Sequence, residues 1–221
     1  MANIFSSTIG KKLIMSLSGL FLITFLLVHL SVNLTMLVSS DLYNEAAHFM
    51  ATNPFIKVME PMLALGFFVH VMYAFVLTFR NMKSRPVAYA VKKECNSSTW
   101  SSRNMLVLGA FLLTFMAVHI VNFWWKMKIS GEIGSVVVNG VEMHDSFALV
   151  TSLFKCWQFD ILYIVSFVLL GLHLVHGFWS AFQTIGMNNN KWFKRLKCAG
   201  TIYAVVVVLG FTIIPVYFLL A

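Results

Sequence analysis

The sequence predicts an all-α integral membrane protein with five transmembrane helices, and three observations lead to this fold class. Hydrophobic residues make up 59% of the 221 positions and charged residues only 11%, whereas a soluble domain has about 45–50% apolar and about 25% charged residues. Five apolar runs are each long enough to cross a bilayer, at about 20 residues per helix. Basic residues gather in alternate connecting segments. A soluble domain and a disordered chain are therefore excluded.

Each apolar run is bounded by charged residues and is interpreted as one span. The first run follows Lys11 and Lys12. It is far longer than the 7–15 residues of a signal-peptide core, so we expect an uncleaved span. With spans of this length, we expect one membrane domain and no separate soluble domain. The five predicted spans cover about 13–38, 58–79, 104–125, 158–182 and 198–220.

The distribution of basic residues predicts the orientation. Segments 1–12, 80–103 and 183–197 hold twelve lysines and arginines against one acid, Glu94, whereas the other side holds four. By the positive-inside rule the N-terminus is cytoplasmic and the C-terminus outside. The twelve are Lys11, Lys12, Arg80, Lys83, Arg85, Lys92, Lys93, Arg103, Lys191, Lys194, Arg195 and Lys197; the four are Lys57, Lys126, Lys128 and Lys155.

Two further features concern the loops and the cysteines. Asn139-Gly140 lies between β-branched residues in the outer loop 126–157, a pattern typical of a tight hairpin, so this loop forms either a small hairpin or irregular structure. Cys95, Cys156 and Cys198 are odd in number and far apart. They predict neither a disulfide framework nor an iron–sulfur or zinc site.

Five of the seven histidines lie inside predicted spans, where ionisable side chains are costly and face the bundle interior. Spans one to four each carry at least one, and span five carries none. At 1.5 Å per residue, His29 and His119 lie roughly 25 Å from the inner face, and His70 and His173 roughly 15 Å. Two histidines at each of two levels suit two haem groups with bis-histidine ligation. His176 is an alternative to His173, because depth does not choose between them.

Two other interpretations of these histidines stay open at this point. A single intramembrane histidine can be a hydrogen-bonded packing residue. A set of them can be the proton relay of a transporter or channel. A reduced-minus-oxidised spectrum separates these cases, because only low-spin haem has a sharp α-band.

The whole arrangement resembles the dihaem cytochrome b membrane-anchor subunit of succinate:quinone oxidoreductases, in its five-helix single-subunit type. Besides the histidines and the basic inner loops, the resemblance rests on Ser18-Gly19-Leu20 followed by His29-Leu30, and on 173–179, reading HLVHGFW. In the family the ligand of span four is similarly followed by glycine at +4 and an aromatic residue at +6. This pattern selects His173 over His176.

The resemblance implies the cofactors and partners. The inner haem b would be held by His70 and His173, and the outer haem b by His29 and His119. The inner face would dock an iron–sulfur subunit, which carries a flavoprotein with FAD that oxidises succinate or reduces fumarate; this chain would have no succinate-site chemistry. The complex would belong to the respiratory chain and the tricarboxylic acid cycle in a bacterial cytoplasmic membrane, with lipid around it and a possible dimer of the whole complex. No nucleic acid is expected.

The resemblance also implies a membrane quinone, expected to be menaquinone, near the outer haem. The candidate contacts are Asn33, His48, Glu60 and Asn122. For Asn33 and Asn122 the alternative is interhelical hydrogen bonding. Some family members have a proton-handling glutamate just after span one, but here the comparable stretch reads His48-Phe49-Met50-Ala51, so Glu45, His48 and Glu60 are substitutes.

Haem propionates are anionic and are expected to meet basic or hydroxyl groups where helices leave the membrane. For each basic candidate the alternative is a snorkelling membrane anchor. The inner candidates are Ser16, Ser18, Trp100 and Arg103, with Lys191 behind them; the outer candidates are Lys126, Lys128 and Lys155.

Within haem proteins the alternative is a cytochrome b subunit of another membrane oxidoreductase, such as a hydrogenase or formate dehydrogenase. The bc-type cytochrome fits less well, because it places two histidines on each of two helices, 13–14 residues apart. Here four spans each supply one expected ligand.

Overall fold

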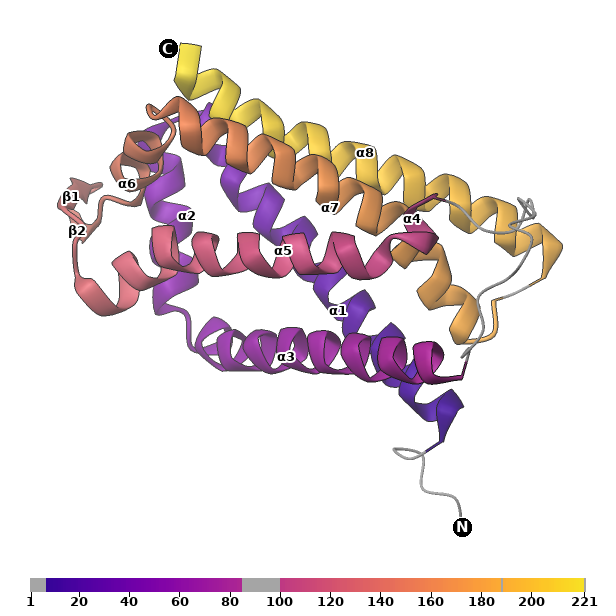
Figure 1. The fold of residues 1–221 in the computed structure, drawn as a ribbon. Coiled ribbons are helices and arrows are strands. Elements are labelled where there is room, and N and C mark those ends of the chain that lie inside the picture. Colours follow the sequence, from indigo (N-terminus) through magenta and orange to yellow (C-terminus); the bar gives the residue numbers. More distant parts are fainter. Residues whose placement is uncertain (1–6, 85–99, 188, 221) are drawn as a thin grey trace.

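The computed structural model describes residues 7–84, 100–187 and 189–220, and these residues confirm the predicted all-α membrane fold (Figure 1). Among them, five helical segments are long and apolar enough to cross a membrane. Residues Arg85, Lys92, Lys93, Glu94 and Cys95 of the expected inner loop lie outside the described residues. The long segments are α1 (Thr8–Leu34), α3 (Pro54–Lys83), α5 (Met105–His119) continued by η2 (Ile120–Ser130), α7 (Trp157–Thr184) and α8 (Asn190–Leu220).

The helices differ in length from the apolar runs, because polar residues at their ends continue or cap them. Helix α1 begins at Thr8, where the Ser7 hydroxyl accepts a hydrogen bond from the Gly10 backbone N–H at 3.0 Å. Side-chain caps of this kind satisfy the free N–H groups of a first helical turn. The third span runs on to Ser130, five residues past the predicted boundary. The membrane boundaries and the orientation stay predictions.

The third span changes its winding directly after His119. Residues Ile120–Ser130 form a π-helix, which ends at Gly131 with φ 64°. Long π-helical stretches are rare, and shorter ones often mark functional sites. Hydropathy carries no sign of this change, because an apolar run looks the same in either winding.

All five long segments belong to one bundle. Helices α7 and α8 lie side by side and antiparallel, α1 contacts α3, α7 and α8, and α5 contacts α7 (Figure 1). The sequence predicts a haem-binding bundle formed by the first four spans, and that stays a prediction. Phe211 of α8 lies with its ring centroid 5.6 Å from that of His29, so the fifth helix also contacts the histidine region.

Glycines allow the closest helix contacts. A Cβ added at Gly171 would lie 2.5 Å from Cγ2 of Val208 on α8, and one added at Gly210 would lie 2.9 Å from Leu30 on α1. A Cβ at Gly66 would meet the Phe21 ring at 2.8 Å. Gly66 and Gly171 thus lie at close helix contacts, as small residues commonly do between membrane helices.

Replacing Gly171 by alanine will therefore lower the free energy of unfolding by about 1–3 kcal/mol, the usual cost of overpacking. The matched control is Gly109→Ala, because a Cβ there meets nothing within 4 Å and alanine is the better helix former. Thermal unfolding of the detergent-solubilised protein, followed by circular dichroism, measures both. Equal midpoints for the two variants would contradict the close approach of α7 to α8.

A cap of short elements covers the end of the bundle that carries the C-terminus (Figure 1). The predicted hairpin is confirmed: β1 (Ser135–Val138) pairs antiparallel with β2 (Val141–His144), and Asn139 and Gly140 both have positive φ, as a type I′ turn requires. Two helices in this cap were not predicted, α2 (Ser40–Thr52) and α6 (Ser146–Leu153); a single turn of helix, η1 (Thr35–Leu37), joins α1 to α2.

One buried asparagine joins the two helices of the cap. Asn44 of α2 donates to the Asp145 carboxylate at 3.2 Å and accepts from the Phe147 backbone N–H at 2.9 Å. Asp145 in turn caps α6 by accepting from the Ala148 N–H at 3.0 Å. The cap therefore holds the outer ends of α1 and α3 at a defined spacing, since α2 connects them.

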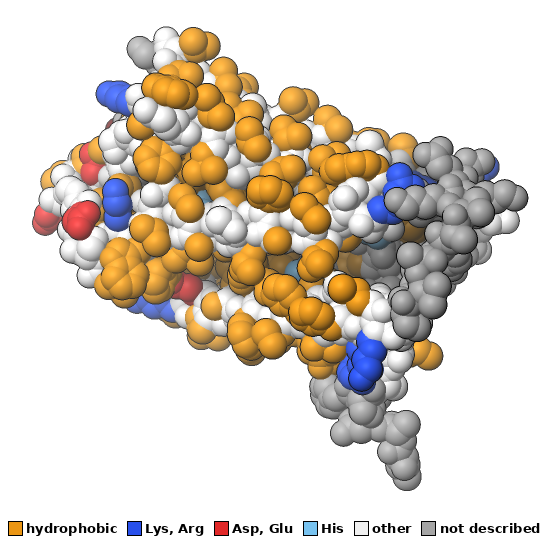
Figure 2. Space-filling view, viewed as in Figure 1, with side chains coloured by type: hydrophobic (Ala, Val, Ile, Leu, Met, Phe, Trp, Pro, Cys, Tyr) orange, Lys and Arg blue, Asp and Glu red, His pale blue; other side chains and the backbone are white. Residues whose placement is uncertain are grey.

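The surface shows an apolar band between two polar ends. Hydrophobic side chains cover the middle of the face seen in Figure 2, and acidic side chains gather at the end with the hairpin. At the opposite end, the described ranges supply Lys11, Lys12, Arg80, Lys83 and Arg103 together with the basic start of α8. The chain is a multi-pass membrane protein, with its basic residues concentrated at the end where α1 begins.

Candidate functional site

The structure brings the four expected histidine ligands together as two pairs. The ring centroids of His29 on α1 and His119 on α5 lie 5.8 Å apart, with their planes at 89°. The ring centroids of His70 on α3 and His173 on α7 lie 6.4 Å apart, with their planes at 66°. These are the pairs that their depths along the helices predict.

The spacing within each pair suits two imidazoles on opposite sides of one metal ion. A metal–imidazole bond is about 2 Å long and the ring centroid lies roughly 1 Å behind the bonding nitrogen, so two such rings have centroids about 6 Å apart. Within the described ranges, no group of three or more His, Cys, Asp or Glu could hold a metal ion. Pairs are what a haem iron needs, because the porphyrin supplies its other four ligands.

Aromatic rings enclose the outer pair. The His29 ring is stacked on Phe25 at 5.3 Å and faces Phe211 at 5.6 Å. The His119 ring lies 5.2 Å from Phe123 and 6.1 Å from Tyr163; Phe115 and Phe123 are one helical turn before and after His119. This is an apolar environment on both sides, suited to a flat hydrophobic macrocycle.

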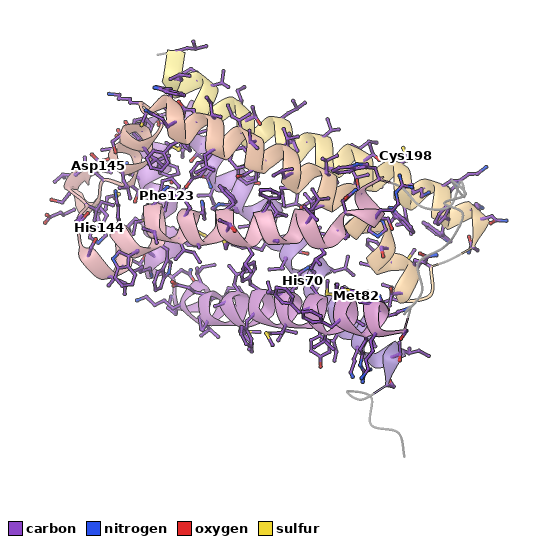
Figure 3. The ribbon with its side chains drawn as sticks, in the orientation of Figure 1. His70, Met82, Phe123, His144, Asp145 and Cys198 are labelled. Carbon is purple, nitrogen blue, oxygen red and sulfur yellow. The ribbon has the colours of Figure 1, made fainter. Side chains whose placement is uncertain are left out.

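The inner pair has a different environment. The Ser18 hydroxyl of α1 lies 3.2 Å from Nδ1 of His70 and donates to the Met15 carbonyl oxygen at 3.0 Å. A Cβ added at Gly19 would lie 3.3 Å from Cε1 of His70. Figure 3 shows His70 on α3, and these contacts place its ring against α1. The inner pair therefore has a hydroxyl group beside it.

His176 lies apart from both pairs. Its ring contacts Trp179 at 5.1 Å, whereas the ring facing His70 is that of His173. Lys197 of α8 lies over the Trp179 ring at 5.1 Å. The geometry therefore favours His173 over His176 as the partner of His70.

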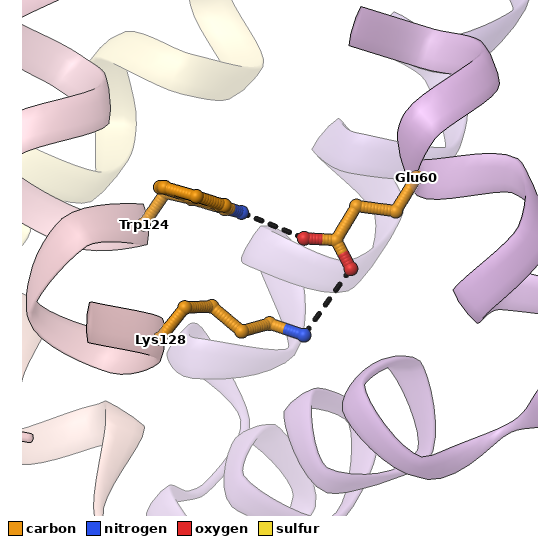
Figure 4. A network of polar contacts seen from close by, with 3 residues as sticks. All are labelled: Glu60, Trp124 and Lys128. Atoms are coloured by element: carbon orange, nitrogen blue, oxygen red, sulfur yellow. Dashed lines mark hydrogen bonds and ion pairs between the residues drawn. The ribbon is translucent and has the colours of Figure 1, made fainter.

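A carboxylate bridges α3 and η2. Glu60 accepts a hydrogen bond from the Trp124 indole N–H at 2.6 Å and pairs with the Lys128 ammonium at 3.2 Å (Figure 4). All three are partly exposed. In this Glu60 cluster (Glu60, Trp124 and Lys128), two donors hold the carboxylate in place.

A cavity of about 140 Å³ lies on the other side of η2, between it, α6 and the start of α7. Residues two apart on a helix face different ways, so Asn122 and Lys126 line this cavity while Trp124 and Lys128 face α3. The Asn122 amide also donates to the Tyr163 hydroxyl at 3.2 Å. The cavity is lined by Asn122, Lys126, Leu149, Ser152, Leu153, Cys156 and Phe159.

A comparison with curated proteins finds a similar protein that is named as a cytochrome b subunit. The chain is 24% identical over 174 residues to the succinate dehydrogenase cytochrome b558 subunit of Bacillus subtilis (strain 168), covering 78% of this chain and 77% of the relative. This chain is similar to a succinate dehydrogenase cytochrome b subunit. The resemblance noted in the sequence is thereby confirmed. No family model and no solved structure matches the chain.

The remaining expected site residues fall at different places. The Asn33 amide donates to the His29 carbonyl at 2.7 Å, so it bonds within its own helix, whereas Asn122 makes the interhelical bond that was the alternative for both.

His48 lies on α2 and takes no part in the Glu60 cluster; Glu45 accepts from Asn139 of the hairpin turn. Ser16 is buried in α1, and Trp100 and Arg103 lie on the short helix α4 (Trp100–Arg103). Lys191 is the second residue of α8, and Lys155 follows α6.

Sequence reasoning missed the aromatic enclosure of the outer pair, and the phenylalanines were assigned no role from sequence. The spacing of Phe115, His119 and Phe123 at i, i+4 and i+8 was an available signal, because such residues share one helix face. The Ser18–His70 contact joins positions 52 apart in the sequence. Local spacing carries no information about such a contact.

Proposed function

We propose that this chain is the membrane-anchoring dihaem cytochrome b of a succinate dehydrogenase or fumarate reductase. It would pass electrons between a flavoprotein/iron–sulfur pair and a membrane quinone. The observation that carries the proposal is the pairing of four histidines on four helices, with ring separations of 5.8 Å and 6.4 Å. The relative's name, a succinate dehydrogenase cytochrome b558 subunit, agrees with this reading.

In this proposal His29 and His119 hold the outer haem b, and His70 and His173 hold the inner one. Haem with two imidazole ligands supplies one-electron transfer without an open position for oxygen. The protein keeps the four imidazoles on rigid helices, so that each pair keeps its spacing. Phe25, Phe211 and the other rings around the outer pair exclude water from it.

Two of the propionate candidates are already engaged in other contacts. Lys128 pairs with Glu60, and the Ser18 hydroxyl lies between His70 and Met15. We propose that Ser16, Trp100, Arg103 and Lys191 meet the inner propionates, and that Lys126 and Lys155 meet the outer ones. Lys126 lines the cavity beside η2, within a polar environment suited to an anion.

Each end of the bundle is assigned one proposed binding partner. The basic end, where α1 begins, would face the cytoplasm of a bacterium and dock the iron–sulfur subunit, which carries the flavoprotein. The quinone, proposed to be menaquinone, would be bound at the other end, near His29 and His119. The Glu60 cluster supports this placement, because quinone chemistry needs a group that moves protons beside an apolar slot.

The test is purification of the complex from its native membrane with an affinity tag on this chain. Pyridine haemochrome analysis is expected to find two haem b per chain, and the dithionite-reduced spectrum a sharp α-band. Flavin and iron–sulfur analysis of the copurified subunits identifies the partner enzyme. A featureless spectrum would contradict the proposal in favour of a histidine-relay transporter, and a copurified hydrogenase or formate dehydrogenase would reassign the partner.

A further inference from the structure

The hydroxyl of Ser18 contacts two groups at once. It lies 3.0 Å from the Met15 carbonyl oxygen, one turn earlier on α1, and 3.2 Å from Nδ1 of His70 on α3. Ser18 is buried, with 9% of its surface exposed, so these two groups replace water as its partners. A serine hydroxyl has one hydrogen to donate and lone pairs to accept with.

One tautomer of His70 satisfies these two contacts together. A carbonyl oxygen only accepts, so the single Ser18 hydrogen is directed to Met15. The Ser18 oxygen then has only lone pairs to offer His70, and the ring must donate its Nδ1–H. In the opposite tautomer Nδ1 accepts, the hydroxyl turns to His70, and the Met15 carbonyl keeps only its backbone bond within the helix. A nitrogen that binds iron carries no proton, so ligation through Nε2 places the proton on Nδ1, and the chain of donors then runs from His70 Nδ1–H to Ser18 and on to Met15.

The next residue of α1 restricts the position of the same ring. A Cβ at Gly19 would lie 3.3 Å from Cε1 and 3.6 Å from Nδ1 of His70, so the imidazole packs closely against the α1 backbone. Since Gly19 blocks one side and Ser18 holds Nδ1, the free nitrogen Nε2 is directed away from α1. The ring across from it is that of His173.

We propose that Ser18 and Gly19 are positioning residues for His70: they hold its imidazole as the Nδ1–H tautomer and direct the Nε2 lone pair toward the space shared with His173. This inference rests on the proposed function, because it assigns Nε2 to the inner haem iron. Nδ1 of His173 is buried and has no hydrogen-bond partner among the described residues. In the inner pair, the His70 ring is thus held at Nδ1 by a hydrogen bond, whereas the His173 ring has no such bond at Nδ1 within the described part of the chain.

The expected consequence is a difference between the two haems. A hydrogen bond to the outer N–H of a histidine ligand raises its basicity and orients the ring, and its loss typically lowers metal affinity 10–100-fold. A more basic ligand stabilises the ferric state. Loss of the Ser18 hydroxyl should therefore raise the midpoint potential of the inner haem, speed its dissociation about 10–100-fold, and leave the outer haem unchanged.

The experiment compares Ser18→Ala, Ser18→Thr and Ser31→Ala in the complete membrane complex. Threonine restores the hydroxyl. Ser31 is a matched control, because its hydroxyl also bonds back to a carbonyl of α1, that of Leu27, but is exposed. Optical redox titration and ferric low-spin electron paramagnetic resonance report on each haem separately, and a His173→Leu variant identifies the inner one.

A raised potential and an altered resonance of the inner haem in Ser18→Ala alone would support the proposal. Unchanged signals of both haems in Ser18→Ala, or a change confined to the outer haem, would overturn it. If Ser18→Ala does not accumulate, Gly19→Ala carries the test, since it displaces the same ring; an unchanged inner haem there overturns the proposal. Absence of haem from the parent complex would instead refute the proposed function, so the two failures are distinct.

Discussion

Replacing His70 or His173 by leucine will remove one haem, and replacing His29 or His119 will remove the other. The reason is that each iron would lose one of two axial imidazoles, and the spacings of 6.4 Å and 5.8 Å assign the partners. Haem content measured as pyridine haemochrome should fall from two to about one per chain in each single variant. His144→Leu is the control, because His144 is exposed at the end of β2, in the hairpin and not on any of the helices that carry the two pairs (Figure 3).

Double variants test the pairing itself. His70→Leu with His173→Leu should retain one haem, like either single variant, because both changes affect the same site. His70→Leu with His119→Leu should retain none, because it affects both sites. If the first combination lost both haems while the second kept one, the pairing seen in the structure would not be the pairing that binds haem.

The second large effect concerns Glu60, where glutamine will lower quinone-linked turnover by about 100-fold while both haems are retained. General acid–base groups contribute about 10²–10⁴-fold to rates, and Glu60 is the carboxylate that two donors hold between α3 and η2. Turnover is measured with a quinone analogue as acceptor for succinate oxidation. Glu132→Gln is the matched control, because Glu132 is exposed just beyond η2 and outside the Glu60 cluster.

Companion variants locate the quinone. Asn33→Leu and His48→Ala should each lower turnover if the quinone contacts expected from the sequence are correct. Ser152→Leu, in the wall of the cavity that Asn122 and Lys126 also line, should lower turnover only if the quinone or an outer propionate lies on that side of η2. If Glu60→Gln, Asn33→Leu and His48→Ala all keep parental turnover, the site lies elsewhere, with the inner face near the iron–sulfur partner as the next place to test.

Some of the site follows from the sequence because it depends on depth along a helix. A fixed rise per residue converts the positions of His29, His119, His70 and His173 into two levels, and antiparallel spans bring equal levels together. The family pattern around His173 separated it from His176, and the ring contacts agree. The Asn139-Gly140 turn was also predictable, because few residues adopt positive φ at two successive positions.

The sequence by itself determined the all-α membrane fold, its five apolar segments and which histidines share a level, because hydropathy and helical rise are properties of each segment alone.

Only the tertiary structure decided which groups meet across helices. The Ser18–His70 contact, the Glu60 pair with Lys128 and the approach of Phe211 to His29 depend on how the helices are rotated about their axes. The close contacts at Gly171 and Gly210 and the π-helical winding after His119 are part of that arrangement. Nearly uniform apolar runs do not specify it, because in lipid every face of such a helix is equally apolar.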